Sequence, residues 1–466
     1  MPDSVMSLEV RASVSLPESK PGPTPFDALW AVTLWLFFLA ALGGAVAGVL
    51  GASFRFALAS TGHLRDALIA YAHGVGTFGW LLPVTAAAGA VALSRLLLRL
   101  EPVAGGSGIQ YAEAVARGLL APQLRILVIP VKFVGGVLSI GAGLALGREG
   151  PTVQMAARVG ALLVRLGRLA VEDARMLRSA VAGAGLGVAF NAPLGGAVFV
   201  FEELWRGFPA RLVACTLIAC AVAITVSRLM LGNHADFPVP NMTLPPAAAL
   251  VPALLLGAAL GLIGALYNRA LIAAIEAFAR PRIIPELKAA VIGGATGLIA
   301  WYLPEVVGGG EALIVPLLHD GGSALLVNLA GILVLRMLLS PVSYAVGTPG
   351  GLFAPVLVIG ALVGALGLRT LDAMGLGFGM SVTGAVLVGM TAFLTAVMRS
   401  PLTAIALVIE MSQNASHLVP MLAACFAAIA VCELVRSEPI YDTLIDRIPE
   451  ARAAEARMAA ANRPDR

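Results

Sequence analysis

Three glycine-rich breaks interrupt the apolar sequence, and their residue types suit the binding of a small anion. The breaks cover residues 105–110, 147–151 and 350–355, and each is followed by an apolar run that can form a helix. A helix start exposes unpaired N–H groups and carries about half a positive elementary charge, so it attracts anions. Pro151 and Pro355 suit a first helical turn, where the missing N–H costs nothing. The sequence therefore predicts an anion site built from partial charges, which hold an ion weakly enough to release it.

One acidic residue, Glu149, lies inside the second break, two residues before Pro151. A carboxylate at membrane depth costs roughly 2.5 to 3.5 kcal/mol, so we expect this one to have a function. It can occupy the place of an anion, exchange protons, and leave that place when it is neutral. The alternative is an ion pair with Arg148, which is disfavoured because neighbouring residues on a helix point apart.

Four further polar residues each have two interpretations. Glu202 and Glu203 end an apolar run, where they either mark the helix end or relay protons. Glu410 occupies the corresponding place later in the chain, and for it the structural role is favoured. Tyr441 either belongs to an interfacial aromatic belt or donates one hydrogen bond to a dehydrated anion.

The remaining candidates for chemistry give little support to an enzyme. Lys132, Arg148 and Arg399 are expected to neutralise buried carboxylates or to extend their charged ends to the interface. The four cysteines lie in apolar runs without metal-ligand spacing, so neither a metal nor a cofactor is expected. There is no His-Glu-x-x-His zinc helix and no Gly-x-Ser-x-Gly elbow, which leaves an intramembrane enzyme as a remote alternative.

The composition places these residues in a membrane protein. Of the 466 residues, 59% are hydrophobic and only 12% are charged, whereas a soluble domain carries about 25% charged residues. This excludes a water-soluble fold. The net charge of +4 is attributed to cytoplasmic loops, and no nucleic-acid partner is implied.

Apolar runs of nearly spanning length predict an all-α, polytopic membrane protein, because about 20 helical residues cross the hydrocarbon core. Several runs are too short to cross it squarely, so tilted and interrupted helices are expected. The runs cover residues 28–54, 74–93, 212–226, 247–266, 289–302, 325–335, 382–398 and 418–431.

An internal repeat divides the chain into two halves. Paired Gly/Pro breaks at corresponding places in two halves are typical of a transporter site near the membrane midplane. The predicted parts are a polar segment 1–27, membrane repeats 28–235 and 236–447, and a short polar tail 448–466. The residues that recur at the same spacing are Ser139, Gly143, Gly147 and Pro151 with Ser343, Gly347, Gly351 and Pro355, and Pro193 and Glu202 with Pro401 and Glu410.

Together the breaks and a late tyrosine resemble the signature of the CLC family of chloride channels and chloride/proton exchangers, over about residues 28 to 447. The resemblance implies two inverted repeats of tilted helices and a homodimer whose subunits each have an anion pathway. It also implies chloride and protons as the transported ions, and a multi-pass protein of the bacterial inner membrane. The residues that carry the resemblance are Gly106-Ser107-Gly108-Ile109, Gly147-Arg148-Glu149-Gly150-Pro151, Gly351-Leu352-Phe353-Ala354-Pro355 and Tyr441.

Carried over by position, the resemblance implies roles for individual residues. Glu149 would be the gate that competes with chloride and carries the proton. Glu203 would be the inner proton-transfer glutamate, which favours an exchanger over a passive voltage- or pH-gated channel. Gln110 departs from the pattern, because the best-known exchangers have proline there. The implied chloride-binding residues are Gly106, Ser107, Arg148, Gly150, Leu352, Phe353, Ala354 and Tyr441, with the two hydroxyls and the amides of Leu352 and Phe353 as donors.

Overall fold

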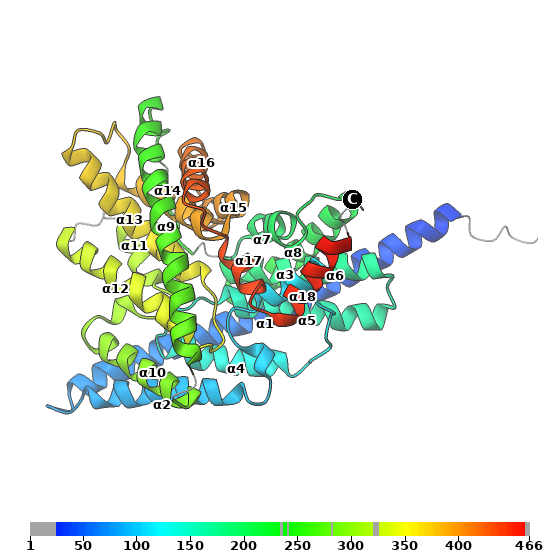
Figure 1. Ribbon diagram of the computed structural model, residues 1–466, viewed down its shortest axis with the longest axis horizontal. Coiled ribbons are helices and arrows are strands. Elements are labelled where there is room, and N and C mark those ends of the chain that lie inside the picture. The colour runs from blue at the N-terminus through cyan, green and yellow to red at the C-terminus, as the bar shows by residue number, and fades with distance from the viewer. Residues whose placement is uncertain (1–24, 234–235, 240–241, 281–282, 320–325, 462–466) are drawn as a thin grey trace, which may run out of the picture.

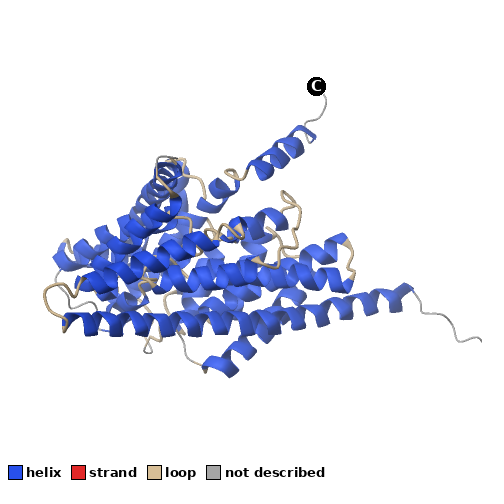
Figure 2. Cartoon of the chain, turned by 90° about the horizontal axis from the view of Figure 1, so that it is seen from below, coloured by secondary structure: helices blue, strands red, loops and turns tan. Residues whose placement is uncertain are grey.

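The structure is a computed structural model that describes residues 25–233, 236–239, 242–280, 283–319 and 326–461. The regular structure in these ranges consists of helices, as Figure 2 shows, and the predicted all-α fold is confirmed. Most of the predicted polar segment 1–27 and the last five residues of the tail lie outside the described residues.

Within these ranges the first half of the chain contributes eight α-helices, and the second half contributes ten. In Figure 1, α5 to α8 lie on the right and α9 to α14 on the left. The first-half helices are α1 (Pro25–His73), α2 (Leu81–Leu97), α3 (Ile109–Ala116), α4 (Val128–Gly141), α5 (Glu149–Gly167), α6 (Val171–Phe190), α7 (Pro193–Phe199) and α8 (Ala210–Leu231). The second-half helices are α9 (Leu250–Ala279), α10 (Pro285–Tyr302), α11 (Glu311–His319), α12 (Leu326–Ala345), α13 (Phe353–Ala373), α14 (Val382–Met398), α15 (Pro401–Ser412), α16 (Leu418–Leu434), α17 (Ile440–Ile445) and α18 (Pro449–Ala461).

Helix lengths agree with tilted and interrupted spans. Five of the described helices are long and apolar enough to cross a membrane, and several apolar helices are shorter. The first predicted run, 28–54, is too short: α1 has 49 residues and continues to His73. At ~1.5 Å per residue such a helix is about 74 Å long, more than twice the hydrocarbon thickness, so α1 must cross obliquely or project beyond it.

Reciprocal contacts join the two halves at corresponding residues. Gly147 and Gly351, which recur at the same place in the repeat, form an isolated antiparallel bridge with N···O distances of 2.9 and 2.7 Å. A bridge between equivalent residues is the contact expected on a two-fold axis that relates the halves. Ser139 Oγ donates to Pro349 O (2.7 Å), and at the equivalent place Ser343 Oγ accepts from Ala145 N (3.0 Å).

Two glutamates make a second reciprocal pair. Glu202 accepts hydrogen bonds from the amides of Leu402 (3.0 Å) and Thr403 (2.7 Å) at the start of α15. Glu410 accepts from the amides of Leu194 (3.0 Å) and Gly195 (2.7 Å) at the start of α7. Each carboxylate therefore caps the helix of the opposite half, where the orphan N–H groups and the helix dipole favour a negative charge. The structural interpretation of Glu410 agrees with this contact.

Glycines set the close approach of paired helices in both halves. Gly44 and Gly48 of α1 face the backbone of α8 at Ala219 and Ala223, and in the second half Gly257 and Gly261 of α9 face α16 at Ala424 and Ala428. Small residues at such positions let the backbones of membrane helices approach closely. This matters because the hydrophobic effect does not drive helices together in lipid, so their association depends on close packing.

Adding one methyl group to Gly257 should therefore destabilise the fold. A Cβ on Gly257 would strike the Ala424 backbone, whereas a Cβ on Gly89 of α2 would meet nothing within 4 Å. Overpacking of this kind costs about 1 to 3 kcal/mol. We expect Gly257→Ala to unfold at a lower temperature in detergent, and Gly89→Ala to unfold no earlier than wild type. Equal melting temperatures of the two variants would contradict this packing.

Candidate functional site

The three glycine-rich breaks meet inside the protein. Gly106 N donates to Gly347 O and Gly350 N donates to Gly106 O, both at 3.1 Å, which joins the first break to the third. The bridge between Gly147 and Gly351 joins the second break to the third. Gly108, the residue before α3, has φ of 86°, a conformation that favours glycine. The starts of α3, α5 and α13 are thereby held together by backbone hydrogen bonds, as an anion site built from helix starts requires.

The Glu149 carboxylate lies on the start of α13. Its Oε1 accepts a hydrogen bond from Phe353 N at 2.6 Å, and its Oε2 has no partner among the described residues. The side chain is fully buried, and a Cβ on either Gly147 or Gly351 would collide with it. The two glycines leave the space that the carboxylate fills. Glu149 thus occupies a place where a helix start would otherwise present its amide to an anion.

Arg148 turns away from Glu149 and pairs with other carboxylates. Its Nη2 lies 2.6 Å from Asp236 Oδ2 and 3.3 Å from Glu311 Oε1, and its Nε donates to Ala189 O at 2.7 Å. The alternative ion pair between Arg148 and Glu149 is not formed. Arg148 does neutralise carboxylates, as expected, but the partners Asp236 and Glu311 were not identified from the sequence.

A cavity of about 220 Å³, called the outer cavity from here on, leads to this region. Gly147, Arg148 and Ala354 contribute to its wall, together with Arg55 and Glu311. Glu149 lies beside this wall, between Arg148 and Gly150 in the first turn of α5. The cavity provides a polar approach to the buried carboxylate from one side.

Two hydroxyl groups, from Ser107 and Tyr441, face each other next to the helix starts, and the side on which they lie is called the inner side from here on. Ser107 Oγ lies 3.3 Å from Tyr441 Oη, and the Tyr441 ring centroid is 6.3 Å from that of Phe353. Tyr441 is 1% exposed, so the interpretation as an interfacial belt residue is wrong. A Cβ on Gly150 would lie 2.6 Å from Ser107 Oγ, which shows how closely α5 approaches this serine.

Tyr344 and Gln110 also support this inner side. The amide of Ser107 donates to Tyr344 Oη at 3.4 Å, a contact that nothing in the local sequence around Tyr344 indicates. Gln110 Oε1 accepts from Gly108 N at 3.0 Å and so caps the start of α3. The glutamine that departs from the family pattern is therefore accommodated by a hydrogen bond to the glycine-rich break itself.

Lys132 differs from its prediction. It neither neutralises a carboxylate nor extends to the interface: the side chain is fully buried, and its Nζ donates to Gly106 O at 2.6 Å. The lysine therefore contacts the residue that directly precedes Ser107. Arg399 lies near an exposed carboxylate where a buried one was expected: its Nε is 3.4 Å from Glu433 Oε1, and the Glu433 side chain is 73% exposed. Its other nitrogens donate to the carbonyls of Ala396 and Ser437.

Glu203 lies apart from Glu202, in a buried polar cluster. Glu203 belongs to the π-helical turn Val200–Leu204, is 5% exposed, and accepts a hydrogen bond from Ser400 Oγ at 2.5 Å. A second buried carboxylate, Glu113, belongs to the same region and pairs with Arg117 at 3.2 Å and with Arg206 at 3.4 Å. The sequence did not single out Glu113, because it stands in an ordinary amphipathic pattern.

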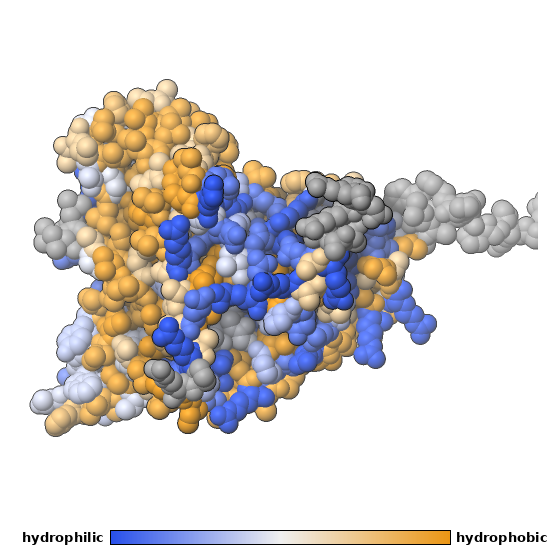
Figure 3. Space-filling view, in the orientation of Figure 1, coloured by the Kyte–Doolittle hydropathy of each residue, from blue (hydrophilic) through white to orange (hydrophobic). Residues whose placement is uncertain are grey.

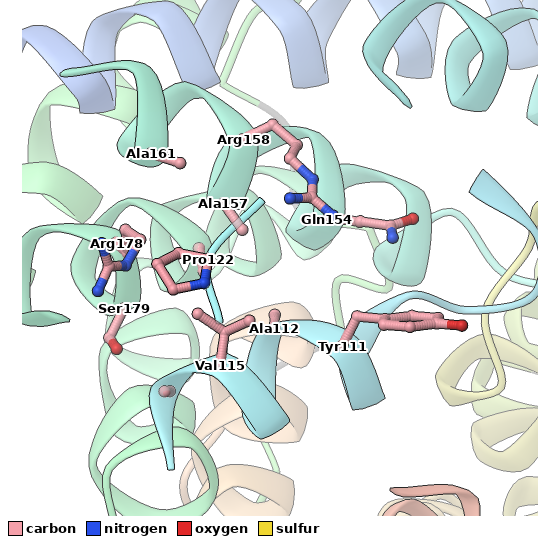
Figure 4. A pocket seen from close by; sticks show the side chains of 12 residues that line it. Tyr111, Ala112, Val115, Pro122, Gln154, Ala157, Arg158, Ala161, Arg178 and Ser179 are labelled. Atoms are coloured by element: carbon pink, nitrogen blue, oxygen red, sulfur yellow. The ribbon is translucent and has the colours of Figure 1, made fainter. Parts of the chain in front are cut away.

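A separate small cavity lies between α3, α5 and α6 (Figure 4), with mostly alanine, valine and proline walls. Its volume of about 40 Å³ is enough for a few water molecules, since one water needs roughly 10 to 15 Å³. Ser179 Oγ, on its wall, has no partner among the described residues, and a water would satisfy it. The cavity is not connected by its lining residues to Glu149, Ser107 or Tyr441.

The described residues hold no group of three or more His, Cys, Asp or Glu side chains that could bind a metal ion, and the four cysteines are buried free thiols. The fold and the site together define a helical membrane protein with interrupted helices whose starts converge around a buried carboxylate. Residues 86–433 match the sequence model of the family described as voltage gated chloride channel, and the chain belongs to this family.

Relatives and solved structures agree with this assignment. The chain is 34% identical over 444 residues to the H(+)/Cl(-) exchange transporter ClcA of Vibrio parahaemolyticus, with 91% of each chain covered. It is also 34% identical to the ClcA of Cronobacter sakazakii, with 92% and 93% covered. The structure of a slow cyanobacterial Cl-/H+ antiporter superposes with a TM-score of 0.84 at 31% identity, over 89% of this chain and 97% of that one. A CLC-type fluoride/proton antiporter, at 19% identity and a TM-score of 0.72, shares the fold over 90% and 98% of the two chains.

Proposed function

We propose that this protein exchanges chloride for protons across a membrane. The observation that carries the proposal is the Glu149 carboxylate on the amide of Phe353, because a titratable side chain there competes directly with an anion. The exchange activity named for the relatives of similar length supports the same function. A passive chloride channel is the alternative outcome of the test below.

In the proposed cycle, Glu149 alternates between two places. As an anion it occupies the start of α13, and as a neutral acid it releases the amide of Phe353, so that chloride can bind there and at the neighbouring amide of Leu352. The hydroxyls of Ser107 and Tyr441 would then coordinate the ion from the inner side. Of the remaining residues assigned to the chloride path, Gly106, Gly150 and Ala354 carry no charge, and Arg148 is neutralised by its carboxylates. The Lys132 ammonium lies beside the path, where it is bonded to Gly106 O.

Protons would reach Glu149 by a different route. Glu203 lies in the buried polar cluster with Ser400, in the π-helical turn that follows α7, and it is not among the residues that line the outer cavity. Buried carboxylates of this kind mark proton paths in membrane transporters. We therefore assign inner proton transfer to Glu203, and a helix-capping role to Glu202.

The surface is suited to a bilayer and to a second copy of the chain. Leu217 and Leu229 of α8 and Leu422 and Phe426 of α16 are 41 to 83% exposed, and lipid or an equivalent subunit would cover them. Figure 3 shows hydrophilic residues gathered over α3, α17 and α18, on a face that includes Arg117, Arg206 and Arg447. By the positive-inside rule we assign this face to the cytoplasm of a bacterial cell. We propose a homodimer in the inner membrane.

Reconstituted vesicles test the exchange directly. An outward chloride gradient should drive protons uphill into the vesicles, and a proton ionophore should abolish the pH change. The measurement uses a chloride electrode and a pH electrode on the same preparation. Chloride movement without proton pumping would contradict exchange and would leave the channel alternative.

Loss of the inner hydroxyls should weaken chloride binding. Ser107→Ala and Tyr441→Phe each remove one donor, and a hydrogen bond to a charged group contributes about 1.5 to 3 kcal/mol, which corresponds to at least a tenfold weaker affinity. Isothermal titration with chloride measures the change. Tyr302→Phe, which alters a tyrosine that is 72% exposed, is the matched control and should bind as wild type. Unchanged affinity in Tyr441→Phe would remove that residue from the site.

A further inference from the structure

A cavity of about 590 Å³ opens where α9 ends and α10 begins, away from the anion path. Its polar lining consists of three cations, Arg95 from α2, Arg280 after α9 and Lys288 from α10. Ile275 and Phe278 belong to its apolar wall, and no acidic residue is among its lining residues. The cavity thus combines a concentrated positive charge with an apolar surface.

The cations are available to a ligand. Arg95 is half-buried and makes no side-chain hydrogen bond or ion pair with a described residue. Lys288 Nζ donates to the carbonyls of Phe278 (2.6 Å) and Arg280 (2.7 Å) and so closes the end of α9, which leaves one of its three donors. Arg280 is exposed. The carboxylate whose charge attracts Arg95, Glu286, is bonded to Arg99. An arginine without its own hydrogen-bonded partner, beside a lysine and a second arginine, favours an anionic group between them.

The cavity lies at the lipid-facing rim on the basic face. Ile283 and Ile284 at its mouth are 51% and 62% exposed, and Val291, one to two turns into α10, is 61% exposed. Glu276, near the end of α9, pairs with Arg447 next to α18, so this end of α9 belongs to the face assigned to the cytoplasm. Basic pockets between membrane helices on that side are suited to anionic lipid head groups.

We propose that this cavity binds an anionic phospholipid of the cytoplasmic leaflet. The phosphate lies between Arg95 and Lys288, with Arg280 at the rim, and an acyl chain packs on Ile275 and Phe278. Neither a halide nor a soluble phosphate has an apolar part that could pack on the apolar wall. A phospholipid has both an anionic head group and acyl chains, so it matches both parts of the cavity.

The bound head group would contact the backbone that supports the inner anion site. Gly347 lines the cavity, and its carbonyl accepts the amide hydrogen of Gly106, the residue before Ser107. Arg95 Nη1 lies only 3.2 Å from where a Cβ on Gly347 would stand. A phosphate that holds Arg95 would therefore fix the turn at Gly347 and, through it, the glycine-rich break that carries Ser107.

Native mass spectrometry of the purified full-length protein in mild detergent tests the binding. We expect phosphatidylglycerol to be retained in preference to phosphatidylcholine, and Arg95→Gln to weaken this retention roughly fivefold, the effect of one cation near an anionic lipid. Arg95 has no hydrogen bond or close ion pair with a described residue to lose, and Glu286, whose charge attracts it, keeps its own ion pair with Arg99, so the variant should fold. Arg165→Gln, which changes an exposed arginine in the last turn of α5, is the matched control.

Each outcome of this measurement bears on the lipid site. Equal retention of the two lipids, or an equal loss in Arg165→Gln, would overturn the site. Displacement of phosphatidylglycerol by inorganic phosphate would show a simple ion site in place of a lipid site. The measurement requires no transport, so a failure of the exchange proposal would not affect its result.

Discussion

Replacing Glu149 by alanine is expected to leave a protein that moves chloride down its gradient but no longer pumps protons. The carboxylate that lies on the amide of Phe353 is the one acidic side chain that contacts the converging helix starts of α3, α5 and α13, among the residues that the structure describes. Without it the place stays open to chloride, and no carboxyl group remains there to exchange a proton. Paired chloride and pH electrodes on vesicles should record chloride flux with proton flux at the level of protein-free vesicles.

A matched control separates this role from the general charge of the outer cavity. Glu311 is also acidic and lies 3.3 Å from Arg148, but its side chain is 43% exposed and does not touch Phe353. Glu311→Ala should therefore keep proton pumping. Pumping by Glu149→Ala, or its loss in Glu311→Ala, would show that the carboxylate on α13 is not the coupling group.

The pH dependence of chloride flux gives an independent measurement on the same residue. Only neutral Glu149 vacates the start of α13, so wild-type chloride flux should fall as the pH rises and the carboxyl loses its proton. Glu149→Gln, which mimics the neutral acid at every pH, should lack this fall. A parallel decline in both proteins would assign the pH dependence to another group.

The convergence of the glycine-rich breaks follows from local sequence features that were visible in advance. Glycine permits close backbone approach, proline marks a first helical turn, and equal spacing in two halves places equivalent turns near one axis. The bridge between Gly147 and Gly351 is the clearest result of this pattern. The sequence predicted which turns meet. It did not predict which amide donates to which carbonyl between them, because that register depends on the tertiary structure.

Partners of buried charges could not be predicted from the sequence. Arg148 pairs with Asp236, and Lys132 binds a carbonyl where a carboxylate was expected. The partners of both cations depend on where segments distant in the sequence lie in the fold, because any set of oxygens that surrounds a buried cation can stabilise it. Tyr344 was missed for the same reason, because its contact with Ser107 is set by the position of α12.

Helix boundaries were predicted less well than helix existence. The run at 28–54 ends in the sequence where polarity rises, yet α1 continues to His73 because its later turns pack on neighbouring helices, as at Ile69 and Ala72. Hydropathy reports the lipid-exposed part of a helix, and a long oblique helix has ends that lie in protein and at the interface. The length of such a helix therefore depends on tertiary contacts.

Replacing Glu203 by glutamine is expected to abolish proton movement while chloride movement remains. The glutamine keeps the size of the side chain and can retain the contact with Ser400 Oγ, which lies 2.5 Å from Glu203 Oε2, but it cannot release or accept a proton at neutral pH. Proton flux in vesicles should fall to the protein-free level under a chloride gradient. Glu433→Gln, at a side chain that is 73% exposed, is the matched control and should pump as wild type.

The two glutamate variants together locate the point where the two ion paths separate. Chloride passes the hydroxyls of Ser107 and Tyr441, and Glu203 lies in a different cluster with Ser400, so a proton blocked at Glu203 need not obstruct chloride. Glu149 serves both ions, and its removal should uncouple them while raising the access of chloride. If Glu203→Gln stopped chloride as well, the paths would share their inner segment, and the buried cluster would have to be reassigned to the anion route.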